Sequence, residues 1–288
     1  MRKLPDAYEP YAWAISTAEA ARIAGIPTDE VLRFDGNVPP KPPPTARPET
    51  IAAALEKVNL YPHGGYPLIH EAIAEYAGVE PGQVVLGAGA DDLIMLCARA
   101  FAEPGDSVAI ADEPTYPLFR LAAWVAGAEV DDRAPALTFC CRPHNPTGAL
   151  VDLPQRRPLV VDEAYFEYAG ETAASLLDDG VIVIRTFSKA FGLASARIGY
   201  LLADAATAGA LRERQHPAPV STPSVALALA GLAQPPDVGP TIAERERLAA
   251  RLRTLGLDPL PSWTNFLYAP LAGARQVAGS LAERGLLV

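Results

Sequence analysis

Short apolar runs alternate with longer amphipathic segments through the middle of this chain of 288 residues. The runs are rich in β-branched residues and are bounded by Gly, Pro and Asp, which is typical of strands buried on both faces. The segments between them carry apolar residues at helical spacing. The pattern therefore predicts an α/β fold with a mostly parallel sheet and crossover helices. Strands are expected at the start of 82–105, 106–116, 136–148, 158–168 and 180–193 and within 196–204, and helices in 50–61, 66–79, the later part of 82–105 and 117–130, whose end starts a further strand.

The pattern changes on both sides of this central region. Residues 16–32 combine a Ser or Thr cap with apolar helical spacing and a Gly-Ile-Pro stop, which predicts a short amphipathic helix. Residues 37–48 contain too many prolines for regular structure and are expected to form a linker. Beyond Asp204, helices are expected in 206–215, 223–233, 241–257 and 274–287, and a last strand in 264–271.

These segments suggest three parts in chain order. Residues 1–34 form an N-terminal arm that contributes to the small domain. Residues 35–204 form the large domain that contains the sheet, and residues 205–288 form a smaller C-terminal α/β domain.

Composition narrows the class of partner. A hydrophobic fraction of 50% with 20% charged residues indicates a globular protein. The formal net charge of -10 disfavours binding to nucleic acid or to an anionic membrane, so a small-molecule partner is expected. No metal-ligand spacing links Cys97, Cys140 and Cys141, which are expected to be buried free thiols. Without a membrane-length apolar run or a signal-peptide core, the protein is expected to be soluble and cytoplasmic.

Every candidate functional group falls where a strand ends and a loop begins, which is where ligands bind to open parallel sheets. In GAGADD, small residues let the backbone amides of Ala90 and Asp91 approach an anion at a helix N-terminus, although an ordinary turn is the alternative. Tyr116 in DEPTY can stack on a planar ring or simply pack. Asn145 in HNPTG can donate to a phenolate-like oxygen or form an Asx-type turn.

Asp162 closes the strand in VVDEAY. A buried carboxylate requires a cationic or hydrogen-bonding partner. A protonated pyridine nitrogen is one such partner, and a structural arginine or a helix cap is the other. Tyr165, three residues further on, can reach the same ligand.

The stretch TFSKAFGLASARIGYLLA places Lys189 among small and apolar residues. A lysine in a dry pocket can have its pKa lowered enough to act as an amine nucleophile and form a Schiff base. Thr186, Ser188 and Arg197 can surround a dianion. Each group is ordinary alone, but together they describe a site for pyridoxal 5'-phosphate (PLP).

The stretches HNPTG, VDEAY and TFSKAFGLASARIGY, in this order, resemble those of the fold-type I PLP enzymes. The chain is most similar to the histidinol-phosphate aminotransferase group of the class I and II aminotransferases, from LRFDGN to its last residue. The resemblance implies a three-layer sandwich around a mostly parallel sheet. It also implies an aminotransferase that moves an amino group between a small amino acid or amine and a 2-keto acid. One option is an amine that carries a phosphate, as histidinol phosphate does. The alternatives are a PLP-dependent decarboxylase or lyase, like the threonine-phosphate decarboxylases, and a non-catalytic PLP-binding protein.

The resemblance also implies a role for each matching residue. Lys189 forms the Schiff base and later moves the substrate proton, and Asp162 keeps the ring nitrogen protonated. Asn145 and Tyr165 contact the ring hydroxyl, and Tyr116 stacks on the ring. The phosphate is assigned to Ala90, Asp91, Thr186, Ser188 and Arg197. Tyr61 in LYPHGG matches a tyrosine that reaches the phosphate of the partner subunit, so a homodimer with composite sites is expected.

Three stretches depart from the family's pattern. The connection AEVDDRAP is shorter than in relatives, and GNVPP keeps Asn37 but has Val38 in place of an acidic residue. TNFLYAPL lacks an arginine after Asn265, and the chain stops at Val288, before the region where relatives place the arginine that grips the substrate carboxylate. The C-terminal domain is therefore expected to be truncated, either naturally or as a shortened form. Arg33, Arg120 and Arg142 are the candidate replacements, with solvated surface charge as the alternative for each.

Overall fold

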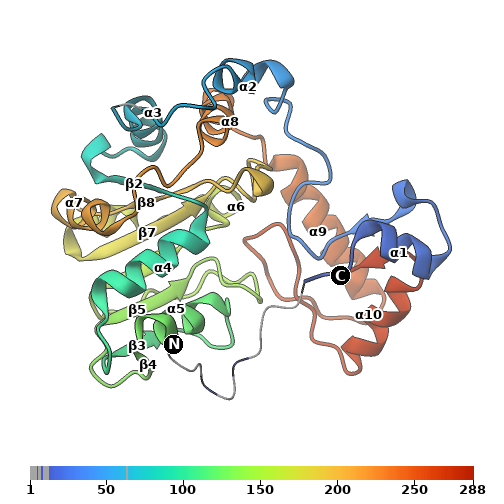
Figure 1. Cartoon of the computed structure of the whole chain (residues 1–288). Helices are drawn as coiled ribbons and strands as arrows, with labels where there is room; N and C mark the ends of the chain where they lie inside the picture. Colours follow the sequence, from blue (N-terminus) through green and yellow to red (C-terminus); the bar gives the residue numbers. More distant parts are fainter. Residues whose placement is uncertain (1–4, 6–7, 9–12, 63) are drawn as a thin grey trace.

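A seven-stranded sheet forms the centre of the molecule (Figure 1). The computed structural model describes Pro5, Tyr8, residues 13–62 and residues 64–288. The strand order is β2-β8-β7-β6-β5-β3-β4, and β8 runs antiparallel to both of its neighbours while the other pairs are parallel. The strands are β2 (Val84–Gly87), β3 (Ser107–Ile110), β4 (Glu129–Val130), β5 (Leu137–Cys141), β6 (Leu159–Asp162), β7 (Val181–Thr186) and β8 (Gly199–Leu202).

Helices cover both faces of the sheet and give three layers (Figure 1). One face packs against α4 (Ala90–Phe101), α5 (Leu118–Ala126) and α7 (Ala205–Arg214). The other face packs against α3 (Pro67–Ala77), α8 (Thr222–Ala233) and the 3-10 helix η3 (Ala174–Asp179), and α2 (Pro48–Leu55) lies on α8. The strands are buried throughout because each face has its own apolar cluster, as the near-continuous apolar runs predict.

A second, two-stranded sheet pairs a segment near residue 32 with a segment at the end of the chain. Its strands, β1 (Leu32–Arg33) and β9 (Leu286–Leu287), are parallel. Around it lie α1 (Thr17–Ala24), η1 (Thr28–Glu30) and α10 (Ala274–Ala282), and α9 (Gly239–Thr254) lies between this lobe and the large sheet in Figure 1. The remaining short elements are η2 (Pro81–Gln83), α6 (Phe166–Ala169) and η4 (Ala194–Ala196).

The α/β fold and the mostly parallel sheet are confirmed, as are the helix stop at Gly25 and the proline-rich linker. The strand expected in 264–271 is wrong, because the Thr264 hydroxyl accepts from the Phe266 amide and holds a local turn in place of a ladder. The helix expected in 274–287 ends at Ala282, and β9 follows it. The link between β5 and β6, all of it described, contains no helix.

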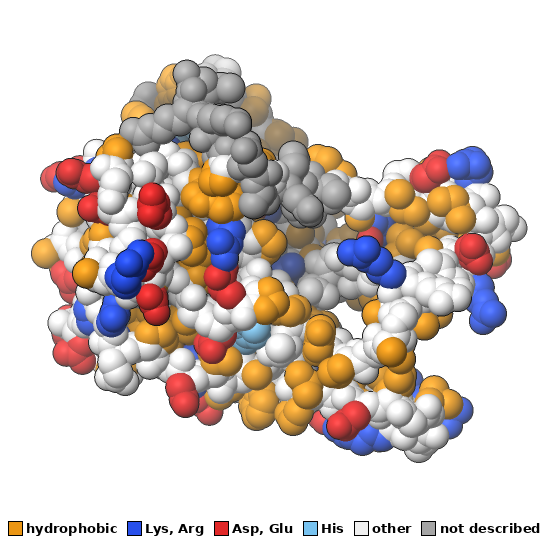
Figure 2. Space-filling view, turned by 90° about the horizontal axis from the view of Figure 1, so that it is seen from below, with side chains coloured by type: hydrophobic (Ala, Val, Ile, Leu, Met, Phe, Trp, Pro, Cys, Tyr) orange, Lys and Arg blue, Asp and Glu red, His pale blue; other side chains and the backbone are white. Residues whose placement is uncertain are grey.

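The cysteines agree with the expectation of buried free thiols, and the surface carries charges of both signs (Figure 2). On the face in Figure 2, acidic and basic side chains are interspersed, and the smaller lobe projects from the large body. All three cysteines are free and buried. No described helix combines the length and the apolar character needed to cross a membrane.

Candidate active site

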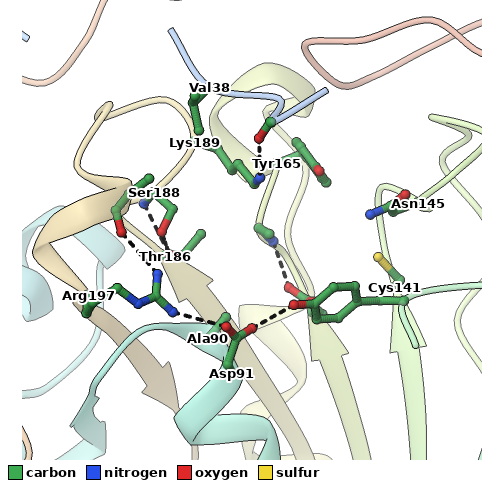
Figure 3. A pocket seen from close by; sticks show the side chains of 15 residues that line it. Val38, Ala90, Asp91, Cys141, Asn145, Tyr165, Thr186, Ser188, Lys189 and Arg197 are labelled. Atoms are coloured by element: carbon green, nitrogen blue, oxygen red, sulfur yellow. Dashed lines mark hydrogen bonds and ion pairs between the residues drawn. The ribbon is translucent and has the colours of Figure 1, made fainter. Parts of the chain in front are cut away.

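A cavity of about 190 Å³ opens at the carboxyl ends of β5, β6 and β7. Every residue that the sequence assigned to the cofactor, except Tyr61, lines it (Figure 3). The sequence missed five further lining residues, which are small, apolar or a thiol: Gly36, Val38, Cys141, Ala164 and Ala194. Motifs spread over residues 90–197 thus meet in one cavity, as expected for the carboxyl edge of a parallel sheet.

Strand alternation decides which carboxylate faces the cavity. Cys141 pairs with Asp162, and Asp162 with Ile184, across β5, β6 and β7. Successive side chains of a strand point to opposite faces. Asp162 therefore faces the cavity, whereas the adjacent Glu163 points to the opposite face and binds Arg185.

The Asp162 carboxyl is 4% exposed, and its one hydrogen bond within the described residues comes from the Ala164 amide at 3.0 Å. Burial raises the pKa of Asp162 to about 7, and the negative charge of Asp91 adds to the rise. The Ala164 hydrogen bond and the nearby Lys189 oppose it. Asp162 is thus a buried carboxyl that a cationic partner would stabilise.

Lys189 follows β7 and enters the same cavity. Its Nζ donates to the Gly36 carbonyl at 3.1 Å and lies 5.7 Å from the centre of the Tyr165 ring. Burial lowers the pKa of Lys189, although the charges of Asp162 and Asp91 oppose the shift. A lowered pKa raises the fraction of neutral amine, the form that acts as nucleophile or base.

An anion cradle lies at the start of α4. Gly89 precedes the helix with a φ of 89°, and a Cβ there would lie 2.8 Å from Arg197 Nη2, so only glycine fits. The first amides of α4, at Ala90 and Asp91, point out of the helix end as hydrogen-bond donors. The Thr186 hydroxyl donates to Ser188 Oγ at 2.9 Å and accepts from the Ser188 amide.

The side chain of Asp91 has contacts that the sequence did not indicate. Asp91 Oδ1 accepts from the Tyr116 hydroxyl at 2.8 Å, and its Oδ2 accepts from Arg197 Nη2 at 3.0 Å (Figure 3). The carboxylate therefore holds both neighbours in place at the edge of the cradle.

Tyr165 and Asn145 lie across the cavity from the cradle (Figure 3). Burial raises the pKa of Tyr165, so its hydroxyl keeps its proton at neutral pH. Asn37 Nδ2 lies 3.4 Å from that hydroxyl. The Asn145 backbone is held by the Thr115 hydroxyl, which donates to its carbonyl at 2.9 Å.

Four nominated side chains lie outside the cavity. Tyr61 is 82% exposed on the surface. The three arginines considered for a substrate carboxylate are bound elsewhere: Arg33 to Asp35 and Thr17, Arg120 to Glu113, and Arg142 to Glu171 and the Val151 carbonyl. Each arginine therefore forms a local ion pair, and the Arg142 side chain is largely buried.

Comparisons with known proteins agree with this geometry. A model of the family "Aminotransferase class I and II" matches residues 29–134 and 130–288. Histidinol-phosphate aminotransferase of Roseiflexus castenholzii is 32% identical over 99% of this chain and 88% of its own length. The crystal structure of histidinol-phosphate aminotransferase from Sinorhizobium meliloti in complex with PLP has a TM-score of 0.78 and 26% identity, and the match covers 99% of this chain and 89% of that one. The L-threonine-O-3-phosphate decarboxylase of Porphyromonas gingivalis shares the fold, with a TM-score of 0.73 at 19% identity over 89% of this chain and 88% of that one.

The same comparisons bear on the segments by which this chain is shorter than its relatives. The alignment with the Roseiflexus protein is 331 residues long, whereas this chain has 288 residues, so the relative carries additional segments. The two family matches meet at residues 130–134, in the connection between β4 and β5 that the sequence indicated to be short. On the family match and on the identity to a relative along nearly its whole length, this chain belongs to the class I and II aminotransferases.

Proposed function

We propose that this enzyme binds PLP in the cavity between α4 and β5–β7 and transfers an amino group from a small amine to a 2-keto acid. Histidinol phosphate, after which its relatives are named, is the first candidate donor. The observation that carries the proposal is the shared cavity of a buried carboxyl, Asp162, and a buried amine, Lys189, beside the cradle at the α4 N-terminus.

The residues present fit this cofactor. The Asp162 carboxyl forms no ion pair within the described residues, and a protonated pyridine nitrogen would supply one in the buried position. The cradle offers the α4 amides, two hydroxyls and the Arg197 guanidinium to a phosphate. The absence of a Cβ at Gly89 lets Arg197 lie against the backbone of the cradle.

When bound, PLP supplies an electron sink for the negative charge that develops at the substrate α-carbon. Lys189 would hold the cofactor through Nζ and, once displaced by substrate, take the α-proton on the same nitrogen. Its lowered pKa suits this role because the neutral amine is the base. Asp162 would keep a proton on the ring nitrogen through the ion pair. Tyr165 and Asn145 would donate to the ring oxygen, and Tyr116 would pack against the ring.

An absorbance experiment tests this function. The purified protein, reconstituted with PLP, is expected to show a visible band that is reduced or shifted when a donor is added and restored by a 2-keto acid. Histidinol phosphate, histidinol, glutamate and phosphothreonine form the donor panel. Release of carbon dioxide would indicate a decarboxylase, colour without any conversion would indicate a non-catalytic PLP protein, and failure to acquire colour would refute the PLP site.

The proposal includes a homodimer in which Tyr61 reaches the neighbouring site. Five large side chains on and between α2 and α3 are exposed and form an apolar surface that a second copy would bury: Leu55, Val58, Leu60, Tyr61 and Leu68. The cradle has room for a further donor because Arg197 and Asp91 are both about half exposed.

Hybrid dimers test the composite site. Tyr61→Ala and Lys189→Ala homodimers are each expected to lose activity. Mixing and refolding them together should restore part of it, because a hybrid contains one site with Lys189 from one subunit and Tyr61 from the other. A protein that sediments as a monomer when fully active would contradict the dimer.

We also infer a reducing, cytoplasmic setting. All three cysteines are free and buried, and burial raises the pKa of Cys140 to about 12, which leaves its thiol unreactive. Localisation of a tagged protein by fluorescence tests this inference.

A further inference from the structure

Three segments that are distant in sequence meet at the hydroxyl of Tyr165. Asn265 Nδ2 donates to the Asn37 carbonyl at 2.9 Å, and Asn37 Nδ2 lies 3.4 Å from Tyr165 Oη. Phe266 packs edge-on against the Tyr165 ring, with 5.3 Å between ring centres. A residue of the C-terminal lobe is thereby connected, through one other residue, to a side chain that lines the cavity.

The segment that presents Asn265 is held firmly in place. The Trp263 amide donates to the Gly148 carbonyl at 2.8 Å, and Arg245 Nη1 donates to the Thr264 carbonyl at 2.7 Å. Gly148 packs so closely that a Cβ there would lie 2.4 Å from Ser262 Oγ. Asn265 is therefore presented from a rigid loop that rests on the HNPTG loop.

Asn37 adopts a backbone conformation that needs such support. Its φ is 49°, in the left-handed region, which asparagine tolerates better than most residues. The neighbouring Gly36 carbonyl accepts from Lys189 Nζ. Residues 36 and 37 thus contact the amine and the phenol of the cavity at once, and Asn265 is the side chain that holds the Asn37 carbonyl.

The direction of these hydrogen bonds constrains Tyr165. An amide nitrogen can only donate, so Asn37 Nδ2 engages a lone pair of Tyr165 Oη. The single proton of the phenol then remains available to an acceptor inside the cavity. The distance of 3.4 Å is long for this bond, so its strength depends on how well Asn37 is aimed.

On the basis of the PLP site proposed above, we infer that Asn265 is a positioning residue that keeps Tyr165 a hydrogen-bond donor to the cofactor's ring oxygen. It does so by fixing the Asn37 carbonyl and thereby aiming the Asn37 amide at Tyr165 Oη.

The pH at which the visible band of the loaded protein changes is the readout. A donor to the ring oxygen stabilises its anionic form and lowers this midpoint. Asn265→Ala is expected to raise the midpoint by about half a pH unit, the size of one weakened hydrogen bond. Asn265→Asp, which turns an oxygen toward the Asn37 carbonyl, should raise it as well. Gln276→Ala removes an exposed amide from the same lobe and should leave the midpoint unchanged.

Double variants separate this role from general loss of structure. In an Asn37→Gly background, which accepts the positive φ but lacks the amide, Asn265→Ala should cause no further shift. The same holds in a Tyr165→Phe background. The titratable groups that face Tyr165 are Lys189, Asp162, Cys141 and Tyr168. Asn265 also hydrogen-bonds Tyr168, so a Tyr168→Phe background is included, in which the shift caused by Asn265→Ala should persist.

The outcomes are distinct. A protein that never acquires colour refutes the PLP site itself. A coloured protein whose midpoint is the same in Asn265→Ala and Asn265→Asp as in the unmodified chain overturns the positioning role and leaves the PLP site standing. If Asn265→Ala does not fold, the double variant of Asn265→Asp with Asn37→Gly tests the inference instead. A midpoint shift in it equal to the sum of the two single shifts would contradict the inference.

Discussion

Asp162 and Glu163 are consecutive buried carboxyl residues at the end of β6, yet their surroundings are opposite. Glu163 is 0% exposed and binds Arg185, itself 2% exposed, at 3.0 Å, and it also accepts from the Thr172 hydroxyl and the Ala173 amide. The Arg185 guanidinium in turn lies 3.5 Å from the centre of the Phe166 ring. Within the described residues, the Asp162 carboxyl accepts a single hydrogen bond, from the Ala164 amide, and forms no ion pair. Glu163 thus has a full set of partners, whereas Asp162 leaves a buried carboxyl for a ligand.

The difference separates a structural charge from a functional one. A buried charge with a complete set of partners contributes to a unique packing arrangement, and removing one partner lowers the free energy of unfolding. A buried ionised carboxyl without an ion-pair partner is unfavourable in the protein alone, and binding a cationic group there recovers that free energy. Strand alternation alone sends the two residues to these two environments.

The strongest test of the functional side is Lys189→Ala. It removes the amine that faces Asp162, so the covalent link to PLP and the base are lost together, and activity is expected to fall at least about 10³-fold. Steady-state kinetics and the visible spectrum measure both losses. Lys41→Ala, an exposed lysine, is the matched control. Retention of the visible band in Lys189→Ala would mean that another group holds the cofactor.

The strongest test of the structural side is Arg185→Met. It leaves Glu163 buried without its cation, so the free energy of unfolding is expected to fall by about 3–5 kcal/mol. Urea denaturation measures the loss, and the folded variant should still bind PLP. Replacing Glu163 by Leu in the same chain should recover part of the stability. A loss below 1 kcal/mol for the single change would show that the pair is not needed.

A pH series sharpens the contrast at Asp162. The folded pKa of about 7 lies above the ordinary value of 3.8, so the folded state retains a proton that the unfolded state releases between these values. In the cofactor-free protein, this contribution to stability is present below about pH 4 and is lost as the pH rises toward 7. The unfolding free energy of the unmodified protein minus that of Asp162→Asn should thus fall over this range, on the order of a few kcal/mol.

The smallest expected effect concerns Asp91. Its carboxylate binds Arg197 and Tyr116 at the edge of the cradle, where it would also repel a phosphate dianion. Because Asp91 and Arg197 are about half exposed, solvent weakens this repulsion. Asp91→Asn is expected to tighten PLP binding by about threefold at low salt, as measured by titrating the cofactor-free protein. Weaker PLP binding would show that the role of Asp91 in positioning Arg197 outweighs its repulsion of the phosphate.

Local patterns in the sequence predicted most of the sheet and ten of the fifteen residues that line the cavity. The strand ends at Asp162 and Thr186, and the glycine turn before Ala90, are features of a few adjacent residues, so periodicity and turn chemistry reveal them. The strand expected in 264–271 failed because side-chain hydroxyls bind the nearby backbone, which an apolar pattern does not report. The sequence did not indicate the Glu163–Arg185 pair, because the register of β6 and β7 is what brings the two residues together.

The sequence by itself determined the elements, the polar groups at the strand ends and the family, because these depend on local side-chain chemistry. Only the tertiary structure decided which segments close the cavity. Asn37 meets Tyr165 across 128 residues, and Asn265 meets Asn37 across 228. Such contacts depend on the paths of loops and on packing between lobes, where the local sequence carries no periodic signal. The same physical reason leaves Asp162 without an ion pair among the described residues, since the partners of a buried charge are set by the fold around it.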